Sequence, residues 1–364
     1  MLLKLLFSTD RERFLPFVVS LTDKGTIGLR IEALGVPVYA LGMRRGVPSP
    51  RILLDLARVV RQEQPQIVQG WMYHGNIVAQ LASLFTERST PILWNIRGTH
   101  TNLREKSFLT AFIIWLGARL SSLPTAIINN SYVSALSHEQ KLGYRTGKWK
   151  VIPNGFDTNI FIPSNDAKIK LRSELGISPE TIIIGLIGRY HPIKDHAGFL
   201  KAASFLLQKH PEVHFVLIGE KIDEDNSELK SFLREIHLRK AVHLLGVRED
   251  ISYLTAAFDI ATSSSLAEGF PNVVGEAMSC EVPCVVTDVG DSARIVGDTG
   301  RVVPLGNPEK LADAWTELII MDAEDRKKLG KLARQRIIDN FSLLSVVSQY
   351  QNLYVDVFKR KELP

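Results

Sequence analysis

The sequence of 364 residues lacks the features that mark membrane-spanning, secreted or disulfide-bonded proteins. No apolar run reaches the roughly 18 residues that a membrane-spanning helix needs. The opening MLLKLLF is too short for a signal peptide, and the charged TDRER follows it at once. The two cysteines, Cys280 and Cys284, have no histidine nearby, so neither a disulfide framework nor a four-ligand zinc site is expected. These absences predict a cytoplasmic protein.

Several functional signatures are also missing. The sequence contains neither the GxGxxG fingerprint of dinucleotide-binding proteins nor a P-loop, so NAD-dependent and kinase functions lose support. Basic residues do not cluster with interleaved aromatic residues, so no nucleic-acid partner is expected. No internal repeat or low-complexity tract occurs.

What is present is typical of a soluble globular protein of two domains, with 45% hydrophobic and 23% charged residues. The charge is unevenly placed. Residues 1–160 contain 19 Lys and Arg against 10 Asp and Glu, whereas the remainder contains 25 against 29. The basic first part is compatible with an anionic partner, such as a membrane surface or an acidic acceptor, and equally with a scattered solvated surface.

Short apolar runs alternate with amphipathic stretches along the whole chain, as where TIIIGLIGR precedes HAGFLKAASFLLQK. This alternation predicts an α/β fold of parallel sheets with helices on both faces. The pattern restarts after a polar break at residues 162–181. We therefore predict two doubly wound, Rossmann-like domains facing each other across a cleft, at residues 1–160 and 161–340, with a long final helix over residues 341–364.

The first strand-to-helix junction of the second domain reads GLIGRYHPIKDH. Doubly wound sheets bind ligands at the carboxyl ends of their strands. Gly188 permits a tight turn there, and Arg189 and Lys194 project two cations from one loop. A guanidinium fork and an ammonium point charge suit a diphosphate. If this loop stood alone, ordinary surface charge would be an alternative explanation for its two cations.

A second junction follows the strand-like DIATSSS and reads EGFPNVVGEAM. Glu268, Gly269 and Phe270 form a loop, and a helix opens behind Pro271, a residue favoured at helix starts. Gly269 lets the backbone approach a ligand, and the amides of Asn272 and Val273 would face an anion at the positive end of the helix.

The two acids of this junction, Glu268 and Glu276, stand on either side of that helix start. They would flank a bound diphosphate and accept hydrogen bonds from the hydroxyl groups of a sugar on one side and a ribose on the other. Each acid alone is compatible with a solvated surface position, but together with Arg189 and Lys194 they favour a binding site.

GRYHPIKDH, EGFPNVVGEAM with its E-x7-E spacing and VIPNGFDTNIFIP at residues 151–163 resemble the family 4 glycosyltransferases of the GT-B fold, and the likeness covers nearly the whole chain. The resemblance implies a retaining, metal-independent enzyme without a cofactor. Such an enzyme would move a hexose-type sugar from a nucleotide-diphosphate donor to a glycan or lipid-linked acceptor in cell-envelope or exopolysaccharide synthesis.

The resemblance also implies roles for individual residues. Arg189 and Lys194 would hold the diphosphate, Glu268 would contact the donor sugar, Glu276 the ribose, and the backbone near Val247 and Arg248 the base. Residues 151–157 would link the domains, and the final helix would cross back onto the first. DED at residues 223–225 resembles the metal-binding motif of the other glycosyltransferase fold, but it stands in a hydrophilic loop and predicts no metal site.

Candidate acceptor-side residues follow strand-like runs of the first domain: His74, Arg97, His100 and Asn130. Structural roles are equally open for His74 and His100. Many relatives carry a histidine at the end of the strand that here closes with Arg97, so the chain departs from the family there.

Two further segments leave alternatives open. Residues 106–123, KSFLTAFIIWLGARLSSL, predict either a core helix or an interfacial helix that rests peripherally on the inner face of an anionic membrane. Relatives begin with a strand and a glycine-rich loop, whereas MLLKLLFSTDRERF resembles their first helix, so that strand is expected to be absent. A nucleotide-sugar-binding protein without turnover, or an epimerase or phosphorylase on the same fold, remains an alternative function.

Overall fold

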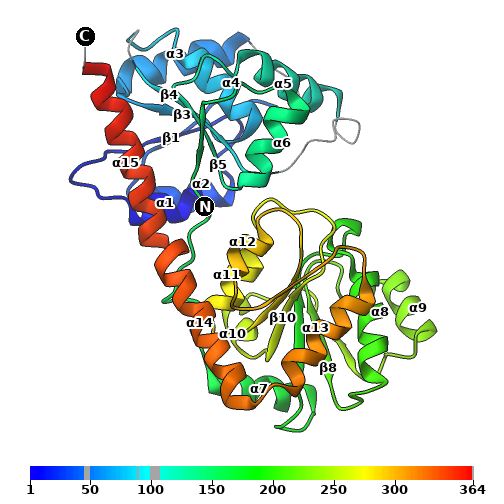
Figure 1. Cartoon of the computed structure of the whole chain (residues 1–364). Helices are drawn as coiled ribbons and strands as arrows, with labels where there is room; N and C mark the ends of the chain where they lie inside the picture. The colour runs from blue at the N-terminus through cyan, green and yellow to red at the C-terminus, as the bar shows by residue number, and fades with distance from the viewer. Residues whose placement is uncertain (45–49, 88–89, 99–106, 363–364) are drawn as a thin grey trace. The chain divides into compact units, whose positions relative to one another are not determined.

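The computed structural model describes residues 1–44, 50–87, 90–98 and 107–362. The chain divides into two compact units, residues 1–155 with 343–364 and residues 156–342 (Figure 1). Both contain parallel strands joined by helices, which confirms the α/β, Rossmann-like class. The arrangement of the units across a cleft stays a prediction.

The second unit is built on a six-stranded parallel sheet in the order β12-β11-β10-β7-β8-β9. The strands are β7 (Ile183–Ile187), β8 (His214–Ile218), β9 (Val242–Leu244), β10 (Ile260–Ser263), β11 (Cys284–Thr287) and β12 (Arg301–Val303). Successive residues of a strand enter different cores, with Ile183 in one cluster and Ile184 in the other. Because both faces are covered, the strands are apolar at nearly every position.

Helices cover both faces of this sheet (Figure 1). One core receives side chains from α8 (His196–Leu207), α9 (Ser227–Glu235) and α13 (Pro308–Ile320). The other receives them from α7 (Asn165–Leu175), α10 (Ile251–Ala256), α11 (Asn272–Ser279), α12 (Ser292–Val296) and α14 (Ala323–Phe341). The strand order reverses between β7 and β10, which creates a topological switch point at their carboxyl ends.

The first unit has two sheets. β1 (Val18–Ser20) pairs with β2 (Val38–Ala40), and β3 (Val68–Gln69), β4 (Ile92–Ile96), β5 (Ala126–Asn129) and β6 (Trp149–Val151) form a four-stranded parallel sheet. No strand ladder joins the two sheets among the residues that the structure describes. The unit opens with helix α1 (Leu2–Ser8), as the pattern of the first residues predicts.

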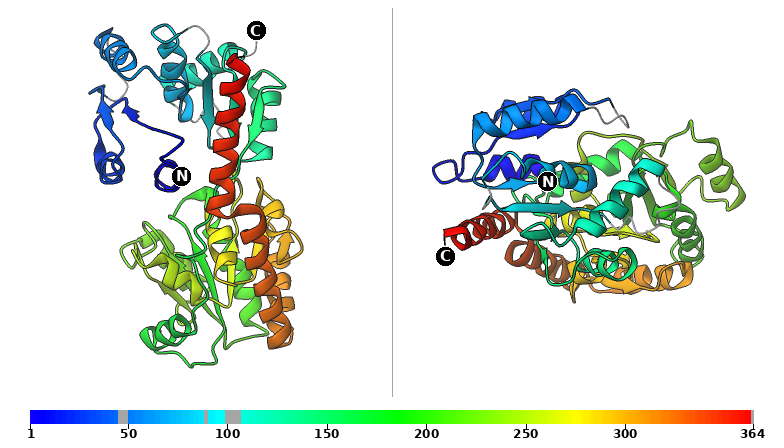
Figure 2. Two further views of the ribbon diagram at one scale, coloured as in Figure 1. Left: turned by 90° about the vertical axis from the view of Figure 1, so that its left-hand side faces the viewer. Right: turned by 90° about the horizontal axis from the view of Figure 1, so that it is seen from above.

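The remaining helices of the first unit are α2 (Gly25–Glu32), α3 (Pro50–Glu63), α4 (Met72–Ala82), α5 (Phe108–Leu120), α6 (Tyr132–Leu142) and α15 (Leu343–Glu362). The long α15 shares a hydrophobic cluster with α1, β4 and β5. It is the long helix, coloured red, that ends at the C-terminus in Figure 2. Side chains of α4 and α5 belong to another cluster, which includes Trp94 of β4 and Ile127 of β5. Within the described ranges, no helix combines the length and apolarity that crossing a membrane requires.

Candidate functional site

Three loops of the second unit meet at the switch point, because they follow the neighbouring strands β7, β10 and β11. The hydroxyl of Ser264 donates to the carbonyl of Lys194 (2.9 Å), and the amide of Leu266 donates to the carbonyl of Ile193 (2.8 Å). The hydroxyl of Thr287, at the end of β11, donates to the carbonyl of Ser265 (2.6 Å). The loops after β7 and β10 are therefore tied together by backbone and side-chain hydrogen bonds.

The loop after β7 turns Lys194 back toward the next loop. A short 3-10 helix, η2 (Pro192–Lys194), begins at His191, whose Nδ1 accepts a hydrogen bond from the amide of Ile193 (3.2 Å). Asp195 follows in the left-handed conformation (φ 50°), and its carboxylate caps α8 by accepting from the amide of Gly198 (3.0 Å). Caps at both ends fix the turn that carries Lys194.

Two of the predicted side chains meet directly. The ammonium of Lys194 lies 2.5 Å from Oε1 of Glu268, and the two side chains are only 25% and 15% exposed. The hydroxyl of Ser265 donates to the same oxygen at 2.8 Å. We call Lys194, Glu268 and Ser265 the carboxylate cluster. Arg189, on the same loop as Lys194, is exposed and forms no ion pair with any described residue.

Sequence reasoning did not select Ser264, Ser265 or Thr287. All three are buried, with exposed fractions of 2%, 1% and 4%. The sequence does contain a signal for these residues, because they are polar residues at the carboxyl ends of otherwise apolar strands. A buried hydroxyl requires a hydrogen-bond partner, so such residues indicate a contact there.

The helix α11 starts beside this cluster. Asn272 is exposed, Val273 and Glu276 are partly buried, and Glu276 lies just over one turn inside the helix. The side chain of Phe270 is 6% exposed and stacks on Phe156 with ring centroids 6.0 Å apart. Only the backbone of Phe270 is therefore available to a ligand.

The loop after β9 carries Val247 and Arg248. Val247 is 73% exposed. The guanidinium of Arg248 forms ion pairs with Asp250 and Glu174, each at 2.7 Å. The hydrogen bonds to Asp250, and after them the one to Glu174, raise the pKa of Arg248. The side chain of Arg248 is thus occupied, and only the backbone of this loop matches the predicted contact with a base.

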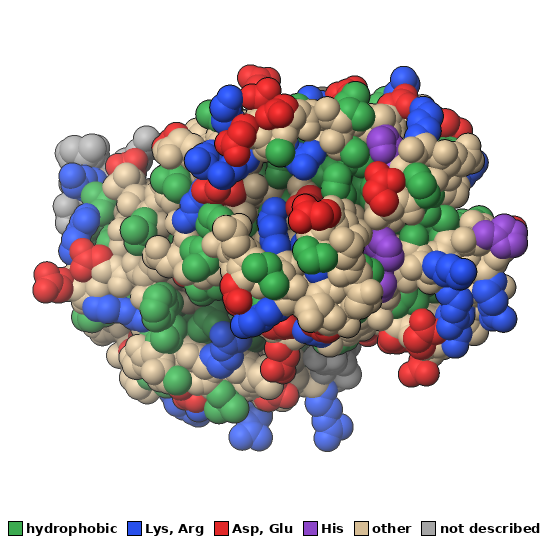
Figure 3. Space-filling model, turned by 90° about the horizontal axis from the view of Figure 1, so that it is seen from below, with side chains coloured by type: hydrophobic (Ala, Val, Ile, Leu, Met, Phe, Trp, Pro, Cys, Tyr) green, Lys and Arg blue, Asp and Glu red, His purple; other side chains and the backbone are tan. Residues whose placement is uncertain are grey.

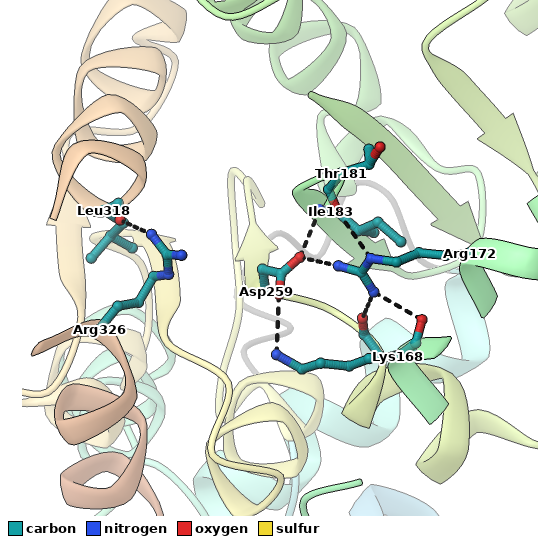
Figure 4. Close-up of polar contacts among 8 residues, drawn as sticks. Lys168, Arg172, Thr181, Ile183, Asp259, Leu318 and Arg326 are labelled. Atoms are coloured by element: carbon teal, nitrogen blue, oxygen red, sulfur yellow. Dashed lines mark hydrogen bonds and ion pairs between the residues drawn. The ribbon is translucent and has the colours of Figure 1, made fainter. Parts of the chain in front are cut away.

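A second polar cluster lies at the opposite, amino end of the same sheet (Figure 4). The guanidinium of Arg172 pairs with Asp259 and donates to the carbonyl of Thr181 (3.0 Å), and Asp259 also accepts from the amide of Ile183 (2.9 Å). Because these groups satisfy one another between α7 and the starts of β7 and β10, we assign this cluster to the stability of the unit.

The guanidinium of Arg97, an acceptor-side candidate of the first unit, is held by neighbouring side chains. Its guanidinium donates to the hydroxyl of Tyr350 (2.8 Å) and to the side chain of Asn154, and lies over the ring of Trp71 (5.4 Å). These contacts join the end of β4 to α15 and to Asn154, which lies within the predicted link of residues 151–157.

The other acceptor-side predictions have mixed outcomes. Asn130 is 5% exposed at the end of β5, and its Oδ1 has no hydrogen-bond partner within the described ranges. His74 lies partly buried on α4. His100 falls outside the described residues. Within the described part of the chain, no hydrogen bond or ion pair joins His74 to Asn130, so the contact of these residues with an acceptor stays a prediction.

Comparison with known proteins agrees with this architecture. The family model described as Glycosyltransferase Family 4 matches residues 11–160, and the model described as Glycosyl transferases group 1 matches residues 181–320. The chain belongs to the family 4 glycosyltransferases.

Individual relatives are distant. The chain is 28% identical to the UDP-Gal:alpha-D-GlcNAc-diphosphoundecaprenol alpha-1,3-galactosyltransferase of Escherichia coli over 59% of this chain and 56% of that protein. It is 24% identical to the N-acetyl-alpha-D-glucosaminyl L-malate synthase of Bacillus anthracis, over 78% and 72% of the two chains. The chain spans about half the length of several of the curated relatives it matches.

Among solved structures, the crystal structure of HepE from Anabaena in complex with UDP has a similar fold. Its TM-score is 0.81 at 23% identity, and the match covers 98% of this chain and 95% of that one. At this identity the likeness concerns the fold alone.

Proposed function

We propose that the chain is a retaining, metal-independent glycosyltransferase that moves a hexose-type sugar from a nucleotide-diphosphate donor to a glycan or lipid-linked acceptor. The observation that carries the proposal is the carboxylate cluster at the topological switch point, with Arg189 on the same loop and the start of α11 beside it. Anionic ligands bind at such helix starts.

The proposed roles of the site residues agree with the charges of their side chains. Arg189 and Lys194 hold the diphosphate and stabilise the negative charge that grows on it as the glycosidic bond breaks. Glu268 contacts the donor sugar, and Glu276 accepts hydrogen bonds from the ribose hydroxyls. The acceptor hydroxyl attacks from the face of the leaving group, and a donor phosphate oxygen takes its proton.

Metal independence is supported by the partners of the one acidic motif that resembles a metal site. Glu224 lies 3.1 Å from Arg239 and 3.6 Å from Lys230, so surface cations neutralise it. The oxygen Oδ1 of Asp223 accepts from the amide of Asp225 (3.1 Å). The two cations of the β7 loop would take the place of a metal ion at the diphosphate.

The names of the relatives support a narrower choice of substrates. UDP occupies the HepE structure, and the Escherichia coli relative is named for a UDP-sugar and a diphosphoundecaprenol acceptor. We propose UDP-hexose as donor and a lipid-linked acceptor used in envelope polysaccharide synthesis, with the enzyme held peripherally at the inner face of the membrane.

A panel of nucleoside diphosphates and nucleotide sugars, screened by thermal shift and followed by calorimetry and product analysis with and without EDTA, tests the proposal. We expect stabilisation by one nucleoside diphosphate, release of that diphosphate with or without EDTA, and an α-configured product from an α-configured donor. Replacing Glu276 with Ala is expected to weaken donor binding by about 1–3 kcal/mol. Binding without any release of nucleoside diphosphate would instead identify a nucleotide-sugar-binding protein.

A further inference from the structure

Helix α5 of the first unit has one buried side and one exposed aromatic side. Ile114 and Ala118 belong to a hydrophobic cluster with Trp94 of β4. On the other side, Phe108 and Phe112 are 88% and 44% exposed, and Trp115 follows at 48%. The spacing of four and three residues aligns these side chains along one stripe.

The stripe ends in a cation. The ring of Phe112 stacks on Trp115 with centroids 5.8 Å apart, and the guanidinium of Arg119 lies 5.5 Å from the centre of the Trp115 ring. The sequence of this segment predicts either a core helix or an interfacial helix. In the structure, α5 has one side packed in the core and an exposed aromatic side.

Helix α6 lies on the same side of the sheet as α5. Because α5 and α6 connect the successive parallel strands β4, β5 and β6, right-handed crossovers place both helices on the same face of the sheet. The amide of Arg145 donates to the hydroxyl of Ser121 (2.8 Å), which ties the ends of the two helices. Helix α6 exposes Tyr132 and Leu136, at 51% and 52%. We define Phe108, Phe112, Trp115, Tyr132 and Leu136 as the aromatic face.

The stretch of chain that contains α5 and α6 is rich in cations. Residues 107–150 contain five cationic side chains against one carboxylate, Glu139. The cations are Arg119, Lys141, Arg145, Lys148 and Lys150. Ordinary solvated surfaces carry both signs, as on the face of the molecule drawn in Figure 3, where acidic and basic side chains are interspersed.

We propose that the aromatic face is a docking surface for an anionic lipid bilayer. Contiguous exposed apolar patches mark interaction sites. Aromatic rings suit the boundary between acyl chains and headgroups, and Arg119 beside Trp115, with the other cations of residues 107–150, favours anionic lipid. The inference deepens the proposed use of a lipid-linked acceptor by assigning the membrane contact to α5 and α6.

Vesicle sedimentation of the full chain tests the proposal independently of sugar transfer. Vesicles of phosphatidylcholine with phosphatidylglycerol are compared with vesicles of phosphatidylcholine alone, at low and high salt. We expect binding to the anionic vesicles that weakens with salt, and a fall of about tenfold or more in the partition coefficient for the double variant Phe112→Ser, Trp115→Ser.

The matched control is the double variant Ile320→Ser, Leu332→Ser on the second unit, which removes two side chains that are 71% and 58% exposed. It should bind vesicles like the unaltered chain, and circular dichroism should show both double variants folded. Equal binding by all three proteins would overturn the proposal, as would a dimer in light scattering that the Phe112 and Trp115 changes abolish without any vesicle binding by the unaltered chain.

Release of nucleoside diphosphate from a soluble donor separates this proposal from the proposed function. If the aromatic-face variant loses vesicle binding but releases diphosphate like the unaltered chain, both proposals stand. If no protein releases diphosphate while vesicle binding still depends on Phe112 and Trp115, the docking surface stands and the transferase proposal fails.

Discussion

Gly290 lies directly beneath the loop that carries Glu268, and its replacement by alanine gives a sharp test of how that loop is held. Its φ of +56° is in the left-handed region, and a Cβ atom at this position would lie 2.5 Å from the carbonyl oxygen of Glu268 and 2.6 Å from that of Gly269. Both neighbours are backbone atoms, and the carbonyl of Gly269 also accepts from the amide of Asp291 (2.9 Å). The loop therefore has to move to admit a methyl group.

Two energetic costs add up to the loss of stability expected for Gly290→Ala. Alanine in the left-handed region is less stable by about 1–2 kcal/mol, and overpacking adds about 1–3 kcal/mol. Gly290→Ala should lower the free energy of unfolding of the second unit by about 2–5 kcal/mol. Gly306→Ala provides the matched control, because Gly306 has a similar φ of +65° and no atom within 4 Å of the added Cβ. Only the conformational cost applies there.

Urea unfolding followed by tryptophan fluorescence measures the stability of both variants, and calorimetry with the donor found by screening measures binding. Gly290→Ala should also weaken donor binding by about tenfold, corresponding to about 1.4 kcal/mol, because the displaced loop carries Glu268. Equal destabilisation by the two alanine variants, together with unchanged donor affinity for Gly290→Ala, would refute the view that the close packing on Gly290 positions the loop.

Three other changes address separate contacts. Lys194→Ala should reduce affinity for the nucleoside diphosphate by about 1.5–3 kcal/mol in calorimetry, since it removes a charged hydrogen-bond donor, whereas Arg239→Ala on the surface should leave affinity unchanged; equal affinities would contradict the assignment. Burial lowers the pKa of His196 to about 4. The unfolded state therefore binds more protons than the folded state between pH 6.5 and 4, and the free energy of unfolding should fall as the pH drops through this window, by up to about 3 kcal/mol for this residue. His196→Phe should flatten that dependence in urea titrations at several pH values, and an unchanged slope would exclude the effect. Arg97→Lys should lower the thermal unfolding temperature of the first unit because lysine cannot make the forked contacts, and an unchanged transition in calorimetric scans would show that those contacts contribute little.

The architecture of the second unit could be predicted from local pattern because its physical cause is local. A strand covered on both faces must be apolar at successive positions, and β7 follows this rule from Ile183 to Ile187. The strand order could not be predicted in this way. Lys194 and Glu268 are 74 positions apart, and their contact depends on β7 and β10 being neighbours in the sheet.

Residue type alone could not show which of two possible environments a side chain occupies. Phe270 stands between a flexible glycine and a helix start, which is typical of a ligand loop, yet its ring completes the core against Phe156 and Phe341. A cation after a strand, such as Arg97, is equally typical of a site. Its actual partner, Tyr350, is 253 positions away on the last helix, so no local pattern could distinguish the two roles.

The serines after β10 show how the sheet itself explains the composition of the site. Thr262 and Ser263 still lie within the strand, and the hydroxyl of Thr262 accepts from the indole of Trp315 (2.9 Å) inside the core. Ser264 and Ser265 then turn their hydroxyls to the β7 loop and to Glu268. Hydroxyl side chains are small enough to fit at a crowded sheet edge. Each of these hydroxyls forms a hydrogen bond there, which a buried polar group requires. A run of small hydroxyl residues at the end of an apolar strand therefore indicates a place where neighbouring loops are tied together, and here the tied loops present the carboxylate and the cation of the candidate site.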